Sequence, residues 1–245
     1  MKIAVITPYF NESEDQLRRC YESVKSQPFD CDHFFVSDGI PHSFLDQIDG
    51  VKHVKLPTCS GDYGNTPRAI AGMLINNAGI YDAACYLDAD NFFLPDHLGL
   101  VVQSITNSDI VCTKREFFSP EGLHLVGACD PDEDRNQHVD TNCIFIASSG
   151  GAFRELAFWA LIPQEVAYSG DRIFFQHLTR ERYRFRFLSE RTVGYETRWR
   201  NHYVRAGVEP PAEALAGSMQ QCRKWIYSLA GAQRTVNAIG FLPHI

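Results

Sequence analysis

The chain has 245 residues, and 23 Lys and Arg against 30 Asp and Glu give a formal net charge of −7. This length predicts one domain of ordinary size, and a hydrophobic share of 44% excludes global disorder. The acidic balance argues against a general nucleic-acid-binding protein, which needs a basic face. No apolar run approaches the roughly 18–20 residues of a membrane span.

Strand and helix signals alternate over the first half of the chain. Residues 1–10 form a short apolar run ending in a loop, which predicts a first strand and not a signal peptide. Residues 13–27 predict a helix, with Ser13 as N-cap and Gln16 completing a capping box. The alternation predicts βαβ units around a mostly parallel, Rossmann-like α/β sheet, with ligands beyond the carboxyl ends of its strands. Further strands are expected at 33–39, 51–57, 83–90 and 109–118, and helices at 66–79 and 94–106.

The alternation weakens from about residue 117. Residues 117–137 are loop-rich, and residues 206–217, with two prolines and several alanines, predict a hinge. The remaining elements expected are a strand at 142–148, helices at 150–161, 169–183 and 220–233, and one or two strands at 184–199.

Two familiar metal-site patterns fail in this sequence. The eight cysteines include no CxxC pair and no zinc-type spacing, so we expect reduced thiols, as in a cytosolic protein. Residues 130–141 begin like a calcium loop, but Arg135 stands where an EF-hand needs Gly, and Thr141 where it needs Glu. A solvated acidic loop is the better interpretation. Its acidic residues are Asp130, Asp132 and Asp134.

Two carboxylates, Asp88 and Asp90, directly follow the apolar residues 83–87. Charges at the end of a buried strand are costly unless they are solvated or paired with a cation. Residues i and i+2 of a strand point the same way, so both carboxylates can approach one site. Their oxygens suit Mg²⁺ or Mn²⁺, and Mg²⁺ completes its shell with water and phosphate oxygens. The pair therefore predicts a metal with a nucleoside diphosphate; ordinary surface acids are the alternative.

Four motifs, in order over residues 3–98, together resemble the family 2 glycosyltransferases, which have the GT-A fold. They are ITPYFNE with its following helix, FFVSDG, the helix start GNTPRA, and YLDADNFFLP. Beyond residue 100 the resemblance is thinner. It implies a single GT-A domain over 1–245, with a nucleotide-sugar-binding half at 1–115, an acceptor half at 116–205 and a helical C-terminal tail at 206–245.

The resemblance also implies roles for residues that match the motifs. Pro8, Tyr9 and Glu12 would line the pocket for the nucleotide base. Asp38 would hydrogen-bond the base or ribose, and Arg68 would contact the diphosphate. An ordinary Asp-Gly turn and a solvated helix residue are the alternatives for these last two positions.

The metal would lie at the fourth strand. By resemblance, Asp88 would touch the ribose or a metal-bound water, and Asp90 would bind Mn²⁺ or Mg²⁺ directly. His202 would be a further metal ligand, since neutral imidazole binds Mn²⁺; a structural role is the alternative. Ser37 replaces the first acid of the family's usual pair and Ala69 replaces a common Asn, which leaves the nucleotide open.

A catalytic base is expected in the second half. The family commonly supplies it from an acidic pair at a helix start; here Gly170 replaces the first acid and Asp171 remains. An inverting transfer needs such a carboxylate to deprotonate the acceptor hydroxyl, although an Asp at a helix start also serves as a cap. A cluster of arginines near the leaving diphosphate would offset its charge, or would form a basic surface. These are Arg198, Arg200 and Arg205.

The combined prediction is a metal-dependent, inverting glycosyltransferase of the hexosyltransferase type. It would move a sugar from a nucleoside-diphosphate sugar to a hydroxyl of a carbohydrate or lipid-linked acceptor, in the cytoplasm or peripherally at the inner face of the membrane. Bacterial surface-polysaccharide synthesis is the family's commonest setting. Residues 221–225 resemble a motif of processive members, but those carry membrane helices, and Trp225 as a core anchor is the alternative.

Three other functions stay open or are set aside. A nucleotide-sugar-binding module without turnover would keep the pocket and explain the missing acid at Gly170. A haloacid-dehalogenase-type phosphatase normally carries its Asp-x-Asp after the first strand, not the fourth. A sugar-phosphate nucleotidyltransferase needs a Gly-rich first loop, and residues 7–14 contain no Gly.

Overall fold

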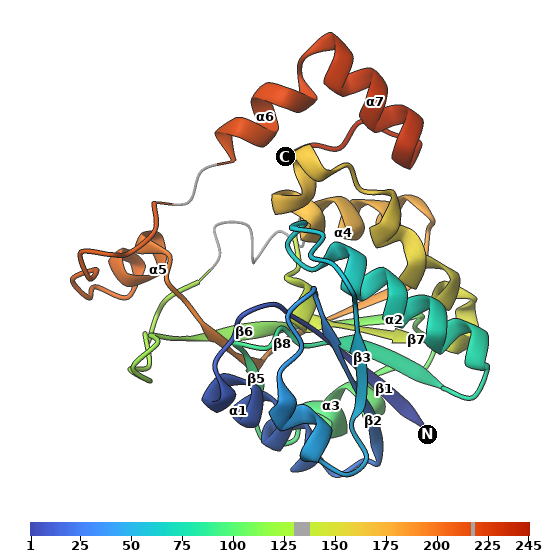
Figure 1. The fold of residues 1–245 in the computed structure, drawn as a ribbon, viewed down its shortest axis with the longest axis vertical. Coiled ribbons are helices and arrows are strands. Elements are labelled where there is room, and N and C mark those ends of the chain that lie inside the picture. The colour runs from blue at the N-terminus through green and yellow to red at the C-terminus, as the bar shows by residue number, and fades with distance from the viewer. Residues whose placement is uncertain (130–137, 217–218) are drawn as a thin grey trace.

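The computed structural model describes residues 1–129, 138–216 and 219–245. Its centre is an eight-stranded sheet in the order β3-β2-β1-β4-β7-β6-β8-β5. In Figure 1, α1 and α3 lie on one side of the sheet, α2 and α4 on the other, and α6 and α7 beyond α4. The strands are β1 (Ile3–Tyr9), β2 (Cys31–Ser37), β3 (Lys52–Lys55), β4 (Ala83–Tyr86), β5 (Phe92–Phe93), β6 (Ile110–Phe118), β7 (Ile144–Ala147) and β8 (Phe185–Glu196).

The described helices are α-helices and shorter 3₁₀ segments. The α-helices are α1 (Glu14–Lys25), α2 (Asn65–Ala78), α3 (His97–Ser104), α4 (Gly170–Arg180), α5 (Arg200–Arg205), α6 (Gln220–Ile226) and α7 (Leu229–Ile239). The 3₁₀ helices are η1 (Ser43–Gln47), η3 (Thr141–Cys143), η4 (Ser148–Gly150), η5 (Ala152–Leu161) and η6 (Gln164–Ser169).

The sheet is mixed, but four of its seven strand pairings are parallel, which confirms the expectation of a mostly parallel sheet. Strands β3, β2, β1 and β4 are parallel, and β6 is parallel to β8. Strand β7 runs antiparallel to both of its neighbours, β4 and β6, and β5 runs antiparallel to β8. An apolar run such as β7 does not encode its direction, because both directions bury the same side chains.

Local signals fixed the helix ends of the first half. Ser13 and Gln16 form the predicted capping box: the Ser13 hydroxyl accepts from the Gln16 N–H at 3.3 Å, and the Gln16 side chain accepts from the Ser13 N–H at 3.0 Å. Helix α2 ends at Gly79, whose φ of 63° suits glycine. A Cβ on Gly72 would lie 2.5 Å from the Leu156 carbonyl oxygen, so α2 and η5 pack closely because Gly72 has no side chain.

Two predicted helices of the second half differ in the structure. Residues 152–161 are a 3₁₀ helix, in which apolar side chains three apart share a face; the same three-residue spacing also occurs in an α-helix, so the sequence predicted a helix but not its type. Residues 220–233 belong to two helices, α6 and α7, and the Ser228 hydroxyl caps α7 by accepting from the Gly231 N–H at 3.0 Å. The described part of the predicted hinge, 206–216, has no helix or strand, but the Leu215 N–H is bound to the Arg198 carbonyl at 2.7 Å.

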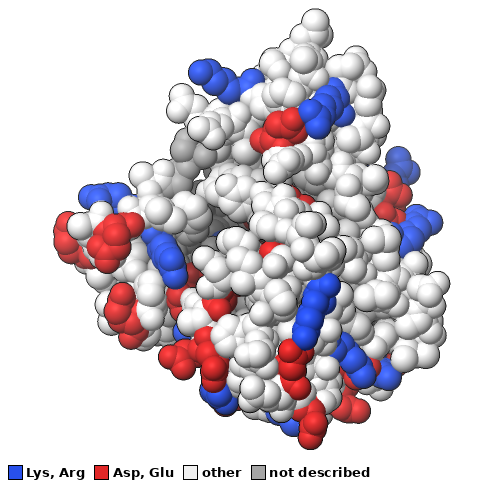
Figure 2. Space-filling model, in the orientation of Figure 1, with Lys and Arg blue, Asp and Glu red and all other residues white. Residues whose placement is uncertain are grey.

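The described surface carries charges of both signs. Figure 2 shows basic and acidic side chains interspersed over one hollowed face of the molecule. Within the described residues, no helix combines the length and the apolarity needed to cross a bilayer. No disulfide joins cysteines in the described part of the chain.

Candidate active site

A pocket of about 460 Å³ opens at the carboxyl ends of β1, β2 and β4, and we call it the first pocket. Residues predicted separately from four sequence motifs line it together. They are Pro8, Tyr9, Glu12, Asp38, Arg68, Asp88 and Asp90. The parallel arrangement of these strands explains the convergence, since their carboxyl ends meet at one edge.

Arg68 is a buried cation on the floor of the first pocket, with 6% of its surface exposed. One guanidinium nitrogen pairs with the Asp88 carboxylate, and Nη1 donates to the Tyr63 carbonyl at 2.8 Å. Its guanidinium carbon lies 5.2 Å from the centre of the Trp159 ring. Asp88 is therefore held by Arg68 on one oxygen, and the burial of Arg68 restricts the motion of both side chains.

Asp90 stands among other acids. Burial, with the charges of Asp88, Glu12 and Glu196, raises the pKa of Asp90 to about 8. Arg19 approaches from α1, but it donates to the Asp90 carbonyl at 2.5 Å and to Glu196 at 2.6 Å, not to the Asp90 carboxylate. An oxygen donor set with an excess of negative charge fits a hard divalent cation.

The protein supplies only part of such a cation's shell. Among residues 1–129, 138–216 and 219–245, no cluster of three or more His, Cys, Asp and Glu is arranged to hold a metal. A cation at Asp90 would therefore take one or two carboxylates and depend on diphosphate and water oxygens for the rest, as Mg²⁺ commonly does.

Tyr9 and Glu12 form another wall of the first pocket. The Tyr9 hydroxyl pairs with His53 Nε2 at 2.6 Å and accepts from the His42 N–H at 2.9 Å, while burial raises its pKa. Glu12 accepts from the Phe10 N–H at 2.7 Å, and burial likewise raises the pKa of its carboxyl. These bonds fix the wall in position before any ligand binds.

Asp38 has structural partners as well as a place in the first pocket. Its Oδ1 accepts from the N–H and the hydroxyl of Ser60, both at 2.7 Å, and its Oδ2 accepts from the Gly61 N–H at 3.2 Å. Gly39 has φ +83°, and a Cβ there would lie 2.5 Å from the backbone nitrogen of Cys59. The Asp-Gly pair therefore holds the loop 59–61 against the pocket.

Asp171 and His202 lie in a different cavity, of about 300 Å³, which we call the second cavity. Asp171 accepts from the Arg172 N–H at 2.7 Å, and its Oδ2 lies 3.2 Å from His138 Nε2. The buried His202 bonds through Nδ1 to the Thr197 hydroxyl at 2.6 Å, and does not line the first pocket with Asp90. As a metal ligand it stays a prediction. The other lining residues include Arg115, Asp140, Tyr168, Tyr195, Trp199, Asn201, Arg205 and Met219.

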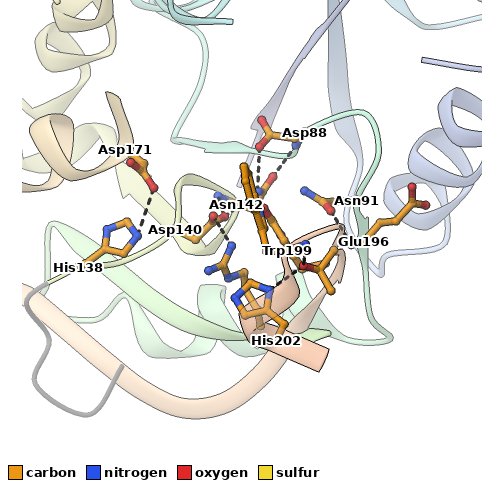
Figure 3. A network of polar contacts seen from close by, with 12 residues as sticks. Asp88, Asn91, His138, Asp140, Asn142, Asp171, Glu196, Trp199 and His202 are labelled. Carbon is orange, nitrogen blue, oxygen red and sulfur yellow. Dashed lines mark hydrogen bonds and ion pairs between the residues drawn. The ribbon is translucent and has the colours of Figure 1, made fainter. Parts of the chain in front are cut away.

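Asn142 connects the first pocket with the second cavity (Figure 3). It is fully buried, and its Nδ2 donates to Asp88 at 3.1 Å and to Asp140 at 2.6 Å. Its Oδ1 accepts from the Asp88 N–H. Asp140 in turn pairs with Arg115 Nη1 at 2.6 Å. A chain of charged and polar groups thus runs from the first pocket to the wall of the second cavity.

The other predictions for the second half have mixed outcomes. Arg198 lies with Asp90 and Glu12 in a side cavity of about 340 Å³, Arg205 lines the second cavity, and Arg200 is exposed on α5. Trp225 packs against the core, in agreement with the anchor interpretation. The acidic loop of Asp130, Asp132 and Asp134 lies outside the described residues.

Sequence reasoning missed several residues of the site. Arg19, His138 and Asn142 carry no motif, and only their distant partners reveal them. The loop before α2 did carry a signal, since Gly61 and Gly64 both precede the helix start and both line the first pocket. Gly64 has φ +80°, which favours glycine at the N-cap of α2.

Comparison with known proteins identifies a family for the part of the chain that forms the first pocket. Residues 4–161 match the model of glycosyl transferase family 2. The chain belongs to this family. A related protein is the succinoglycan biosynthesis protein ExoW of Rhizobium meliloti (strain 1021), 29% identical over 115 residues, or 45% of this chain and 36% of ExoW. The match thus spans only about a third of that relative.

Solved structures confirm the GT-A fold. TarS 1-349 of S. aureus in complex with UDP aligns with 97% of this chain and 72% of its own, with a TM-score of 0.61 at 17% identity. TarS 1-349 in complex with UDP-GlcNAc aligns with 97% of this chain and 73% of its own, with a TM-score of 0.61 at 16% identity. At such low identity the likeness shows the fold and not the substrate.

Proposed function

We propose that this family 2 member transfers a sugar from a nucleoside-diphosphate sugar to an acceptor hydroxyl. The observation that carries the proposal is the convergence of Arg68, Asp88 and Asp90 in the first pocket, next to a second cavity that holds Asp171. The donor would bind in the first pocket and the acceptor in the second cavity. Asn142, which bonds to groups of both, lies between the two.

Asp90 would hold Mn²⁺ or Mg²⁺, with Asp88 close to its water shell. When bound, such a cation neutralises the leaving diphosphate as a Lewis acid. Arg68 already pairs with Asp88 and leaves Asp90 without that compensation. The group of acids around Asp90, which a cation would neutralise, supports the assignment of the metal to this residue.

Asp171 would be the base of a single, inverting displacement. The acceptor oxygen forms a bond to the anomeric carbon while the bond from that carbon to the diphosphate breaks, and Asp171 takes the hydroxyl proton. Its carboxylate lines the second cavity, where an acceptor would lie. Burial alone would raise the pKa of Asp171, but His138 and the Arg172 N–H hold it below its usual value, so the carboxylate is ionised and can accept a proton at neutral pH.

The names of the similar proteins suggest which substrates to test first. TarS structures contain UDP and UDP-GlcNAc, which makes UDP sugars the first donors to try. ExoW is named for succinoglycan biosynthesis, which favours a carbohydrate acceptor in polysaccharide synthesis.

A thermal-shift panel tests the donor side of the proposal. UDP, GDP, dTDP, CDP and ADP are added with and without Mn²⁺ to the wild type, Asp90→Asn and the exposed control Asp15→Asn. A ligand at about 100 times its Kd stabilises the folded protein by about 2.7 kcal/mol. We expect one diphosphate to raise the melting temperature of the wild type and the control with Mn²⁺, and Asp90→Asn to lose this metal-dependent rise.

Turnover separates the enzyme from a binding module. Asp171→Asn is expected to bind the same nucleotide and to lose transfer. If the wild type binds a nucleotide but cleaves no nucleoside-diphosphate sugar, with or without an acceptor, the chain is a binding module. If no nucleotide shifts a well-folded wild type, the proposal is wrong.

A further inference from the structure

One histidine of the second cavity contacts the proposed base directly. His138 Nε2 lies 3.2 Å from Asp171 Oδ2, and Figure 3 shows the imidazole facing that carboxylate. The His138 side chain is only 7% exposed, whereas that of Asp171 is 31% exposed to the cavity. The two residues come from separate segments, the stretch before η3 and the first turn of α4. Their contact is therefore made by the tertiary fold.

The two oxygens of Asp171 have different partners. Oδ1 accepts from the Arg172 N–H at 2.7 Å, and Oδ2 faces His138. Contacts on both oxygens limit rotation of the carboxylate. This matters for a general base, because its oxygen must first lie within hydrogen-bond reach of the proton that it takes. Without His138, Oδ2 would lose this contact and the carboxylate would be free to turn away from the acceptor.

The state of the imidazole follows from its surroundings. His138 Nδ1 is buried and has no hydrogen-bond partner among the described residues. A buried donor without an acceptor is more costly than a buried acceptor without a donor, which assigns the proton to Nε2. The Nε2–H then donates to Asp171, and a hydrogen bond to the charged form favours the carboxylate over the acid.

We propose that His138 is a positioning residue for this glycosyltransferase, acting through Asp171 to aim its carboxylate and keep it ionised. The inference rests on the proposed role of Asp171 as base. His138 keeps its own proton throughout: the acceptor proton passes to Asp171 as the new bond to the anomeric carbon forms and the diphosphate leaves with the electrons of the bond that breaks.

Other charged groups around the second cavity also act on Asp171. Asp140 is a like charge that disfavours its ionised form, and Arg172 favours that form, while Tyr168 of η6 is a neutral phenol whose own pKa is raised by burial and by Asp171. Arg115 of β6 is compensated by its pair with Asp140. The remaining titratable or charged groups that line the cavity are His202, Arg205 and Tyr195. Since burial and the neighbouring Asp140 persist when His138 is replaced, the loss of His138 is expected to raise the pKa of Asp171.

Hydrolysis of donor sugars tests the inference without a known acceptor, because water can take the place of the acceptor hydroxyl. UDP release from UDP-GlcNAc, and diphosphate release from a panel of other nucleoside-diphosphate sugars, is followed from pH 3.5 to 9 for the wild type, His138→Ala, His138→Gln and Asp171→Asn. His138→Gln places an amide N–H near the position of Nε2 but cannot titrate. Melting curves with the nucleotide confirm that each variant is folded and binds donor.

We expect His138→Ala to lower kcat about 10- to 100-fold with unchanged nucleotide binding, and to move the acid limb of kcat/KM to higher pH. His138→Gln is expected to recover most of kcat. Wild-type turnover with an unchanged rate and pH profile in His138→Ala would overturn the role of His138. Full turnover in Asp171→Asn, or none in the wild type, would instead overturn the proposed function, and so the two failures are distinguishable.

Discussion

Asp90→Asn is expected to stabilise the ligand-free protein at neutral pH while it removes metal-dependent nucleotide binding. Burial and three neighbouring acids raise the pKa of Asp90 to about 8 from an ordinary value of 3.8. Folding at neutral pH must therefore either add a proton to this carboxyl or bury its charge, and both lower the free energy of unfolding. An amide of the same shape carries no charge and does not titrate, so it avoids this loss.

The sign and size of the effect follow from linkage. Below pH 4 the carboxyl is protonated in both states and costs nothing. As pH rises from 4 to 8 the unfolded chain ionises first, and stability falls by up to about 1.4 kcal/mol per pH unit. The full penalty at pH 7 is about 4 kcal/mol, and relaxation and water entry reduce it. We therefore expect Asp90→Asn to raise the free energy of unfolding by about 1–3 kcal/mol at pH 7.

Urea unfolding followed by circular dichroism at pH 5, 6, 7 and 8 measures this difference. The gap between Asp90→Asn and the wild type should grow with pH, whereas the exposed control Asp15→Asn should follow the wild type. Curves for Asp90→Asn and wild type that stay parallel, or a less stable variant at pH 8, would refute the charge argument. Mn²⁺ with the matching diphosphate should narrow the gap by stabilising only the wild type.

Three further changes test the packing of α2 on η5, the buried His33 and the link between the two cavities. Gly72→Ala should destabilise the protein by about 1–3 kcal/mol, because its Cβ would meet the Leu156 backbone at 2.5 Å; a melting temperature within 1 °C or so of wild type would contradict the close packing of α2 on η5. Burial lowers the pKa of His33 to about 3, so its contribution to stability is complete above pH 6.5 and is lost as pH falls toward 3. His33→Gln should therefore flatten the pH dependence of unfolding between pH 6 and 4 by about 1.4 kcal/mol per pH unit, and an unchanged slope would show that the imidazole is solvated. Asn142→Asp places a third carboxylate between Asp88 and Asp140, so chemical unfolding should show a loss of about 2–4 kcal/mol at pH 7. The loss should shrink at pH 4.5, because burial raises the pKa of Asp140 and the introduced carboxyl between two acids is also more easily protonated; equal losses at both pH values would argue against charge repulsion.

Local sequence signals predicted the parts of this fold that depend on near neighbours. The capping box of Ser13 and Gln16 and the helix stop at Gly79 depend on a few adjacent residues, and both are present. The first pocket was predictable because parallel strands bring their polar ends to one edge. Acid pairs such as Asp88 and Asp90 therefore marked it directly.

Contacts between distant segments were not predictable in the same way. Nothing in the sequence around Asn142 indicates that its amide lies between Asp88 and Asp140, because that position depends on the direction of β7. His202 and Asp90 line different cavities because β8 ends at Glu196 and His202 lies beyond it on α5. The apolar pattern of residues 184–199 does not predict where that strand ends. Sequence reasoning thus reached the residues that belong to motifs, but neither the partners that hold them, such as Asn142, nor their division between two cavities.

The reversed direction of β7 has a consequence for how such a protein can diversify. Because β6 runs parallel to β8 and antiparallel to β7, the connection from β6 to β7 leaves and re-enters the sheet at the edge where the first pocket opens. Insertions or replacements there would remodel the wall around Asp140 without changing the register of β1, β2 or β4. The strands that line the first pocket could thus stay constant while the residues between β6 and β7 are exchanged, so that the two cavities can change independently of each other.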